Sequence, residues 1–432
     1  MRHFYVSVRA NSPLAIRSDH AEGGAKTIQY ITGTTVLGSL ASAHRLLRAE
    51  QKDEFAQLFL NERMYFSHLY PASFNKSKSS GIDTSNLPVL PLPKTAQTCK
   101  RFPGFLPVPG EDTDEERHGI RDSLLDWAVF SLLDKEQSST SKLLVPLSGH
   151  AFCTQCKRPM DSINGYYRRA RSDPRQRMKA QVNTLLRTHT GINRDWGIVE
   201  EGILYNREVF EQGMPFWGEV ILPDDLATTF KEFVEEADAE DIIRMGTGRT
   251  RGMGRVNIQV ARETMEVVGG RARNIESFKN RLISFDKAMR KRAQEAKVTN
   301  LAPFYFAITL RSASILCDPF LRYRRTIDGA VLGELLNSST ITFSRVYQST
   351  GVQRITGWNE VWGTPRTNDY AIEVGSTFLF ACSFKPDDTL ISDDTLTQAL
   401  YRVEEEGIGR RRSEGFGRIY ISDPFHLEGE QS

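Results

Sequence analysis

Two cysteines separated by two residues give this sequence its strongest chemical signal. Cys153 and Cys156 lie in SGHAFCTQCKRPM, and this spacing lets two thiolates reach one Zn²⁺ ion. Because a structural zinc ion takes four ligands, two more are needed. Cys99, in QTCKRFPGF, is the natural third ligand. The fourth is His118 or His150, and we favour His118 because His150 lies only three residues before Cys153 and would crowd the pair.

Two other interpretations of the cysteine pair stay open. The residues can be reduced surface thiols, or a redox pair of the thioredoxin type, although no strand–helix–strand pattern surrounds them. His118 also begins a predicted helix, which supports its role as a ligand. A bound zinc ion would stabilise the fold of an insertion that is too small to form its own hydrophobic core. For these reasons we predict a structural zinc site in an insertion at about 72–160.

Two loops rich in glycine and arginine form the second candidate site. GTGRTRGMGRVNIQV and GIGRRRSEGFGRIYI each contain a Gly-x-Gly, a basic segment and a second Gly-x-Gly before an arginine and an apolar strand. Glycine permits positive φ, so backbone N–H groups can line an anion, and arginine adds bidentate donors to phosphate oxygens. The predicted binding residues are Gly246, Gly248, Arg249, Arg251, Gly252, Gly254, Arg255, Gly407, Gly409, Arg410, Arg411, Gly415, Gly417 and Arg418.

The order of elements around the loops excludes the common nucleotide motifs. A dinucleotide fingerprint runs from strand to loop to helix, whereas each loop here lies between a predicted helix and a strand. Neither loop has the Gly-Lys-Ser/Thr of a P-loop, and no protein-kinase signature accompanies them. A polynucleotide backbone is the remaining anion with spread-out phosphates. Tight turns with solvated arginines are the alternative.

Two further segments offer binding or catalytic side chains. In YYRRARSDPRQRMKAQ, Arg168 and Arg169 follow two tyrosines, so phosphates and stacked bases are candidate ligands, with a solvated loop as the alternative. In AIRSDHAEGGAK, Asp19 is a candidate metal ligand and His20 a candidate general base near neutral pH. We favour an exposed polar loop without catalysis for this second segment.

Composition limits the class of protein. The chain has 432 residues, 39% hydrophobic and 25% charged, which fits two or three globular domains. A net charge of +2 excludes a basic coat over the whole surface but allows local basic patches. Five cysteines suit a reducing cytoplasm. No stretch of about 18 apolar residues occurs, so we expect no membrane span.

The pattern of elements predicts an internal duplication. A strand at 3–9 precedes a helix capped by Thr34 or Thr35, and the first half ends with a helix at 226–244, a glycine loop and a strand. PFYFAITLRSASIL repeats the opening theme, and the second half ends with a helix at 394–406, a glycine loop and a strand. We predict domains at 1–270 and 301–432, joined by a helical linker at 271–300.

Several segments resemble the RAMP superfamily of CRISPR-associated proteins. ITGTTVLGSLASAH is similar to the family's IPGSSLRGALR, with Val36-Leu37 in place of Leu-Arg, so an expected backbone-contacting arginine is missing. GINRDWGIVEEGILYNREVF is similar to the family's hairpin, with Asn193-Arg194 in place of Asp-Arg. ITGWNEVWGTPRTNDYAIEVGSTFLF resembles the second half of the large two-unit RAMP protein of type III-D effector complexes.

The resemblance implies an α+β chain of tandem ferredoxin-like (RRM-like) folds with the zinc insertion in the first. It implies a non-catalytic, RNA-binding subunit of a type III CRISPR effector ribonucleoprotein that holds crRNA near its 5′ handle for antiviral defence. The implied partners are the large polymerase-like subunit and backbone RAMP subunits. The alternative is an endoribonuclease that processes pre-crRNA or cleaves target RNA with Asp19 or His20.

Overall fold

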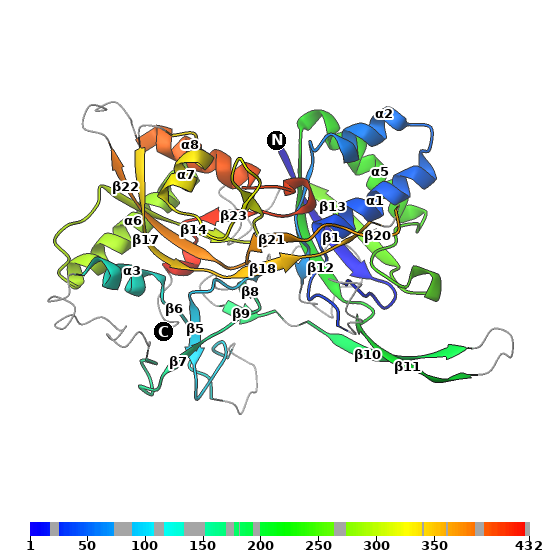
Figure 1. Cartoon of the computed structure of the whole chain (residues 1–432), viewed down its shortest axis with the longest axis horizontal. Helices are drawn as coiled ribbons and strands as arrows, with labels where there is room; N and C mark the ends of the chain where they lie inside the picture. The colour runs from blue at the N-terminus through cyan, green and yellow to red at the C-terminus, as the bar shows by residue number, and fades with distance from the viewer. Residues whose placement is uncertain are drawn as a thin grey trace.

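Two antiparallel sheets, one from each half of the chain, organise the protein (Figure 1). The computed structural model describes residues 1–17, 26–72, 89–107, 116–133, 152–169, 177–180, 182–192, 199–262, 274–338, 341–359, 362–384 and 393–427. Within these ranges the protein is a mixed α+β structure with several smaller antiparallel sheets. No helix in them combines the length and apolar composition that a membrane span requires.

The first sheet forms around β1 (Arg2–Ala10), which confirms the strand expected at 3–9. Its strand order is β13-β1-β12-β2, and β3 also pairs with β12. The bounds are β2 Tyr65–Phe66, β3 Tyr70–Pro71, β12 Pro215–Leu222 and β13 Val256–Arg262. Because side chains alternate along a strand, Val6 and Val8 enter the core, whereas Tyr5 stacks on Trp217 across the opposite face.

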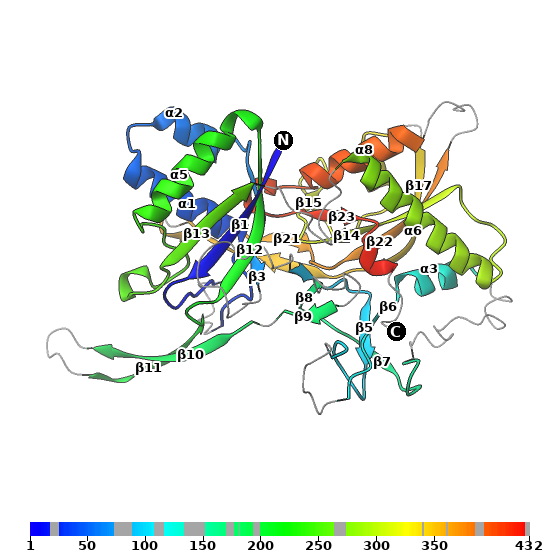
Figure 2. The same cartoon turned by 180° about the vertical axis from the view of Figure 1, so that it is seen from behind.

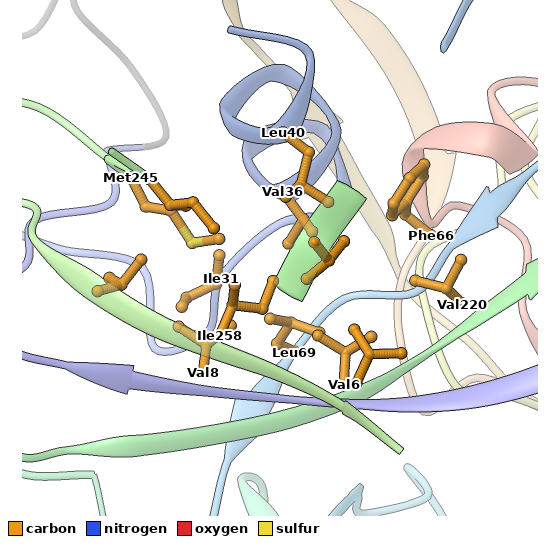
Figure 3. Close-up of a cluster of buried hydrophobic side chains, with 14 of the residues drawn as sticks. Val6, Val8, Ile31, Val36, Leu40, Phe66, Leu69, Val220, Met245 and Ile258 are labelled. Atoms are coloured by element: carbon orange, nitrogen blue, oxygen red, sulfur yellow. The ribbon is translucent and has the colours of Figure 1, made fainter. Parts of the chain in front are cut away.

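Helices α1 (Gly33–Leu47) and α5 (Ala227–Ala239) cover the core face of this sheet. Figure 3 shows Val36 and Leu40 of α1 pointing toward side chains of β1, β12 and β13. The cap predicted at Thr34 or Thr35 is wrong. Thr32 caps α1 by accepting a hydrogen bond from the Thr35 backbone, while the Thr34 hydroxyl donates to Glu414 of the other half.

The second sheet repeats the order of elements of the first. Its strand order is β17-β22-β14-β23, with helices α7 and α8 packed on it. In each half a central strand leads to a helix, an edge strand, the other central strand, a second helix and the other edge strand. The bounds are β14 Phe304–Leu310, α7 Gly329–Leu336, β17 Ile341–Ser349, β22 Thr377–Phe384, α8 Asp393–Glu406 and β23 Ile419–Ile421.

The segment between the halves forms α6 (Ile275–Glu295), which begins with a capping box between Asn274 and Ser277. Its apolar face, which includes Phe278 and Leu282, is buried in the core of the second sheet. The helical prediction for this stretch is confirmed. The helix is therefore more than the linker that we predicted, because it covers the second sheet.

The segment between β3 and β8 packs on the second half, although it lies in the first half of the sequence. Leu124 and Val129 of α3 share a core with α6, β14 and β22. Buried Asp126 pairs with Arg121 and with Arg292 of α6. The bounds are β4 Leu90–Pro91, β5 Ala96–Cys99, β6 Ile120–Asp122, α3 Leu124–Leu132 and β7 Met160–Ser162.

A long hairpin leaves the body of the protein. Figures 1 and 2 show β10 (Thr184–Ile192) and β11 (Val199–Phe210) extending away from the first sheet. This confirms the hairpin predicted before β12. The remaining elements are α2 Lys52–Phe55, the π-helical turn Ala56–Leu60, β8 Tyr166–Arg169, β9 Arg177–Lys179, β15 Leu316–Cys317, β16 Tyr323–Arg324, β18 Val352–Ile355, β19 Trp358–Asn359, β20 Thr364–Pro365 and β21 Asp369–Ile372.

A buried ion pair between α6 and α8 generates a stability prediction. Both carboxylate oxygens of Glu404, a residue only 1% exposed, accept from Arg281 at 2.7 Å. Replacing Glu404 with Gln leaves the Arg281 charge buried without its counter-ion, which costs about 3–5 kcal/mol. Urea unfolding of Glu404→Gln measures the loss. The control Glu235→Gln removes an exposed partner of Lys231 and costs less than about 1 kcal/mol; equal losses would contradict the prediction.

Candidate nucleic-acid interface and metal centre

Three cysteines and one histidine converge beside β5. One donor atom from each of Cys99, His118, Cys153 and Cys156 lies within 4.8 Å of all the others. The Cys99 and Cys156 sulfurs are 3.5 Å apart, and Nδ1 of His118 is 3.2 Å from the Cys153 sulfur. Ligand atoms of a tetrahedral zinc site stand about 3.8 Å apart, given Zn–S distances of about 2.3 Å. The donor set and its spacing therefore fit a metal ion.

Local structure explains how the four residues meet. Cys99 ends β5, and the tight turn around Cys153–Cys156 is closed by a hydrogen bond from the Lys157 backbone to the Cys153 carbonyl. His118 precedes strand β6, so the prediction that it begins a helix is wrong; the helix α3 begins only at Leu124. His150, the alternative ligand, lies outside the described residues.

The environment also favours thiolate at one position. Burial raises the pKa of Cys156, but hydrogen bonds from the Arg158 backbone and from the other three donor residues outweigh it and lower that pKa to about 7. The second nitrogen of His118 lies 3.2 Å from a carboxylate oxygen of Glu116, which orients the ring. A metal ligand must be deprotonated, and Cys156 favours that state, whereas burial raises the pKa of Cys153.

The two glycine loops have the same backbone. All eight predicted glycines lie at positive φ, between 72° and 95°. In the first loop the Met245 N–H donates to Gly254 O and the Gly254 N–H to Pro13 O, at 2.8 and 3.0 Å. In the second, the Ile408 N–H donates to Gly417 O and the Gly417 N–H to Ala313 O, both at 2.8 Å. Each loop thus closes over the turn that follows the first strand of its sheet.

The two loops correspond differently in the structure and in the sequence pattern. At the first Gly-x-Gly, the sequence pattern pairs Gly246 with Gly407, and the structure shifts this pairing by two residues. Gly246 corresponds to Gly409, because a Cβ on either would clash with the carbonyl of Ala15 or Ile315 at the same turn. Gly248 then corresponds to Arg411, which itself lies at φ 58°. The second loop therefore places an arginine in the left-handed conformation where the first has glycine.

The second glycine loop forms an intramolecular contact with the first half of the chain. Its tip, the 3₁₀ turn η4 (Arg412–Glu414), contacts α1 and β2 of the first half. A Cβ on Gly415 would lie 2.6 Å from His68 Nδ1 and 2.8 Å from the Phe66 carbonyl oxygen. In Figure 3 a red ribbon of the C-terminal segment lies beside Phe66.

The arginines of the second loop are committed to internal partners. Arg411 pairs with Asp369 at 2.8 Å and with Glu414 at 2.7 Å. Burial raises the pKa of Glu414, but Arg411 and Arg366 outweigh it and hold that pKa at about 2. Arg418 is buried and donates to the Glu405 carbonyl. Of the predicted arginines in this loop, Arg410 is the exposed one.

The first loop is open to solvent. Its tip, η3 (Arg249–Arg251), is exposed, and a Cβ on Gly252 would meet nothing within 4 Å. Arg255 pairs with Asp241 at 2.6 Å, and Arg251 donates to the Tyr205 hydroxyl at 2.6 Å. This last contact joins the loop to the long hairpin.

A crowded group of arginines surrounds that junction. Arg187 of β10 lies directly opposite Arg207 of β11, and two positions further along His189 stacks on Tyr205, with the ring centroids 5.3 Å apart. Like charges in opposite register are destabilising. Desolvation and the nearby charges of Arg17 and Arg251 lower the pKa of Arg207, which is 8% exposed.

The pKa of His189 is also lowered, by desolvation first and then by Arg207, Arg251 and Arg187. No carboxylate in the described part of the chain forms an ion pair with Arg17, Arg187 or Arg207. Among the residues that the structure describes, positive charge thus accumulates beside a flat aromatic stack without a carboxylate paired to it. An extended anion with aromatic bases satisfies both features.

The other predicted residues fall elsewhere. Arg169 and its neighbour Tyr167 on β8 are buried, and Tyr167 packs on Phe425 at 5.1 Å. Arg168 is half-buried on the same strand. Asp19 and His20, and likewise Asn193 and Arg194, lie outside the described residues.

Sequence reasoning missed the hairpin arginines. A signal was available, because RTH in β10 and YNR in β11 place a basic and an aromatic residue at alternate positions of facing strands. The alternation alone does not say which residues face each other. The strand register does, because it sets Arg187 opposite Arg207 and His189 opposite Tyr205.

The sequence of this chain matches a known protein family over its first half and beyond. The model of the RAMP superfamily matches residues 7–257, which is more than half of the chain. This chain belongs to the RAMP superfamily. No protein with a curated functional description matches it.

Three solved structures similar to this RAMP protein share about a tenth of its residues. A chain of type III-B Cmr-beta bound to cognate target RNA and AMPPnP has 12% identity and a TM-score of 0.36, covering 87% of this chain and 86% of that one. A chain of a type IV-B CRISPR complex has 12% identity and a TM-score of 0.25, covering 63% and 94%. Thermus thermophilus Cas6 has 11% identity and a TM-score of 0.28, covering 48% and 74%.

The matched loops predict unequal effects of one substitution. Gly252→Ala and Gly415→Ala both force alanine into positive φ, which costs about 1–2 kcal/mol. Gly415→Ala also drives a methyl group into Phe66 and His68, so it should cost at least about 2 kcal/mol more. Urea unfolding of the two variants measures the difference. Equal destabilisation would show that the second loop is not packed on the first half as described.

Proposed function

We propose that this RAMP protein is an RNA-binding subunit of a type III CRISPR effector ribonucleoprotein that holds crRNA, near the 5′ handle of the guide. The observation that carries the proposal is the group of arginines at the base of the long hairpin, which lacks a counter-charge within the described chain. Membership of the RAMP superfamily supports the CRISPR context. The subtype we propose is III-D, on the sequence resemblance of residues 355–380.

The proposed grip is built from the first glycine loop and the hairpin. Phosphate oxygens would neutralise Arg187, Arg207 and Arg17, removing a repulsion that the protein carries when alone. The exposed tip, Arg249 to Gly252, with Arg255 and the flanking Gly246, Gly248 and Gly254, offers backbone and guanidinium donors to a neighbouring phosphate. The face of the His189–Tyr205 stack would accept a base.

The second loop has a smaller place in this proposal. The tip of this loop, with Gly415, packs on the first half, and Arg411 and Arg418 bond to protein groups. Gly407, Gly409 and Gly417 pack against the second half. Arg410 is exposed and stays a candidate RNA contact, as does half-buried Arg168. We leave buried Arg169 out of the proposed interface.

The proposed architecture is a tandem of ferredoxin-like units. Both sheets have the order edge, centre, centre, edge with two helices between the strands, which supports this interpretation. In the assembled particle the partners would be the large polymerase-like subunit and backbone RAMP subunits, acting in the cytoplasm in antiviral defence. We propose no catalysis. Cleavage by Asp19 or His20 is the alternative, and no observation of the described residues favours it.

The metal we propose is a structural Zn²⁺ held by Cys99, His118, Cys153 and Cys156. Three sulfurs and one imidazole nitrogen are the donor set that zinc prefers at a closed, four-ligand site. When bound, the ion would tie the turn at Cys153–Cys156 to the end of β5. It would thus stabilise a segment whose small core is shared with the second half.

The first prediction of this proposal separates RNA binding from folding. Arg187→Gln should weaken binding of crRNA about tenfold and lower the slope of log affinity against log salt by about 0.7, the loss expected for one phosphate contact. Its free energy of unfolding without RNA should stay equal or rise by up to about 0.5 kcal/mol, because a like-charge pair is relieved. Filter binding at several salt concentrations and urea unfolding measure the two effects.

Arg63→Gln is the matched control, since Arg63 forms an exposed pair with Asp225 on the first half. It should leave RNA affinity and salt slope unchanged. The RNA proposal fails if Arg187→Gln binds crRNA as the unchanged protein does, or if both variants lose affinity equally.

The second prediction concerns the metal. The purified protein should contain one zinc ion per chain by mass spectrometry, and Cys153→Ser with Cys156→Ser should lose it together with thermal stability. Cys317→Ser, which removes a cysteine outside the cluster, should keep the ion. Zinc retained by the double variant, or no metal in the unchanged protein, would disprove the site.

A further inference from the structure

The joint between the halves is a protein recognition site with defined parts. The tip of the second glycine loop sits on the N-terminus of α1 and on edge strand β2. Gly33 is the key position, because a Cβ there would clash with the Glu414 carbonyl and would lie 2.7 Å from the Phe66 carbonyl oxygen. The Thr34 hydroxyl then donates to the Glu414 carboxylate at 2.8 Å. The site is thus the first turn of a helix, packed against an edge strand.

The second half contains the equivalent surface, and no glycine loop of the described residues occupies it. Gly329 begins α7 as Gly33 begins α1, and a Cβ on Gly329 would clash with the Phe343 carbonyl of edge strand β17 as one on Gly33 would with Phe66. A groove of about 680 Å³ lies there, lined by residues that include Gly329, Ala330, Gly333, Glu334, Ile341 and Phe343. Ala330, which corresponds to Thr34, is exposed.

We propose that the groove between α7 and β17 receives the glycine loop of a neighbouring RAMP subunit, docked as the second loop of this chain docks on its first half. The two halves are arranged head to tail: the glycine loop beside β23 meets β2 of the first half. That arrangement leaves the loop beside β13 at one end and the α7–β17 groove at the other. In Figure 1, β13 lies in the right half and α7 and β17 in the left half.

A repeated heterologous contact extends in one direction until a different subunit ends the series.

The contact between the second glycine loop and the α1–β2 site indicates what would occupy the groove. The α1–β2 site takes a short 3₁₀ turn that ends in a glycine at positive φ, and this turn brings the Glu414 carbonyl onto the first helical glycine. Glu334, whose carboxylate pairs with Arg324 at 2.9 Å, offers a polar group at the mouth of the groove. This inference rests on the proposed function, which supplies a neighbouring subunit of the same fold.

Photocrosslinking in the assembled ribonucleoprotein tests the proposal. Benzoylphenylalanine in place of Ala330 should crosslink to a peptide of a neighbouring RAMP subunit, and mass spectrometry should place that peptide in its late glycine loop. The same label in place of exposed Glu276 on α6 is the control and should give no such product. Crosslinks to RNA, to a second copy of this chain or to another part of the neighbour would overturn the proposal, as would the absence of a crosslink.

A blocking variant separates this contact from RNA binding. Ala330→Arg fills the groove at an exposed position, so its own fold should be retained, and association with the neighbouring subunit should weaken at least about tenfold. Its affinity for crRNA should equal that of the unchanged protein and of Glu276→Arg. If Ala330→Arg associates with the neighbouring subunit as the unsubstituted protein does, and both bind crRNA, the proposed docking site is wrong and the proposed function stands. If the unsubstituted protein itself does not bind crRNA, the proposed function is wrong.

Discussion

The close approach of two backbones at Gly33 and Gly415 is the constraint on which the arrangement of the two halves depends. Neither position has room for a Cβ, and the Glu414 carbonyl comes directly onto the first turn of α1. The contact carries charge as well, since Arg411 and Arg366 keep Glu414 ionised although it is largely buried. Buried pairs of this kind fix geometry, because removing one partner leaves the other charge unsatisfied.

The contact at Gly33 and Gly415 places the two glycine loops in different environments, although their backbone conformations are similar. The second loop loses its solvent exposure to the first half, and its left-handed Arg411 turns to Asp369 and Glu414. The first loop keeps its exposed tip and faces the long hairpin, where Arg17, Arg187 and Arg207 form no ion pair with any carboxylate of the described residues. Two copies of one motif therefore support one internal contact and one candidate RNA contact.

The segment between β3 and β8 has a structural role that its position in the sequence hides. The Asp122 carboxylate accepts a hydrogen bond from buried His426, whose other nitrogen lies 2.7 Å from the Thr309 hydroxyl, so residues from distant parts of the chain meet in one network. Arg121, Asp126 and Arg292 form a second such link. The candidate metal cluster sits on the outer end of the same small sheet, where a bound ion would compensate for the lack of an extensive local core.

Periodicity and residue type alone determined the elements: the opening strand, the hairpin, both late helices and the glycine loops, because alternation and glycine act within a few residues. The cysteine spacing likewise pointed to the cluster. Local pattern could not say that Thr32 caps α1, that His118 precedes a strand, or that Gly246 corresponds to Gly409, since packing across the two halves sets these. Nor could it separate Arg251 from Arg411. Both lie in the basic segment after a Gly-x-Gly. Only the tertiary structure exposes one to solvent and surrounds the other with carboxylates, because burial and charge pairing join residues far apart in the chain.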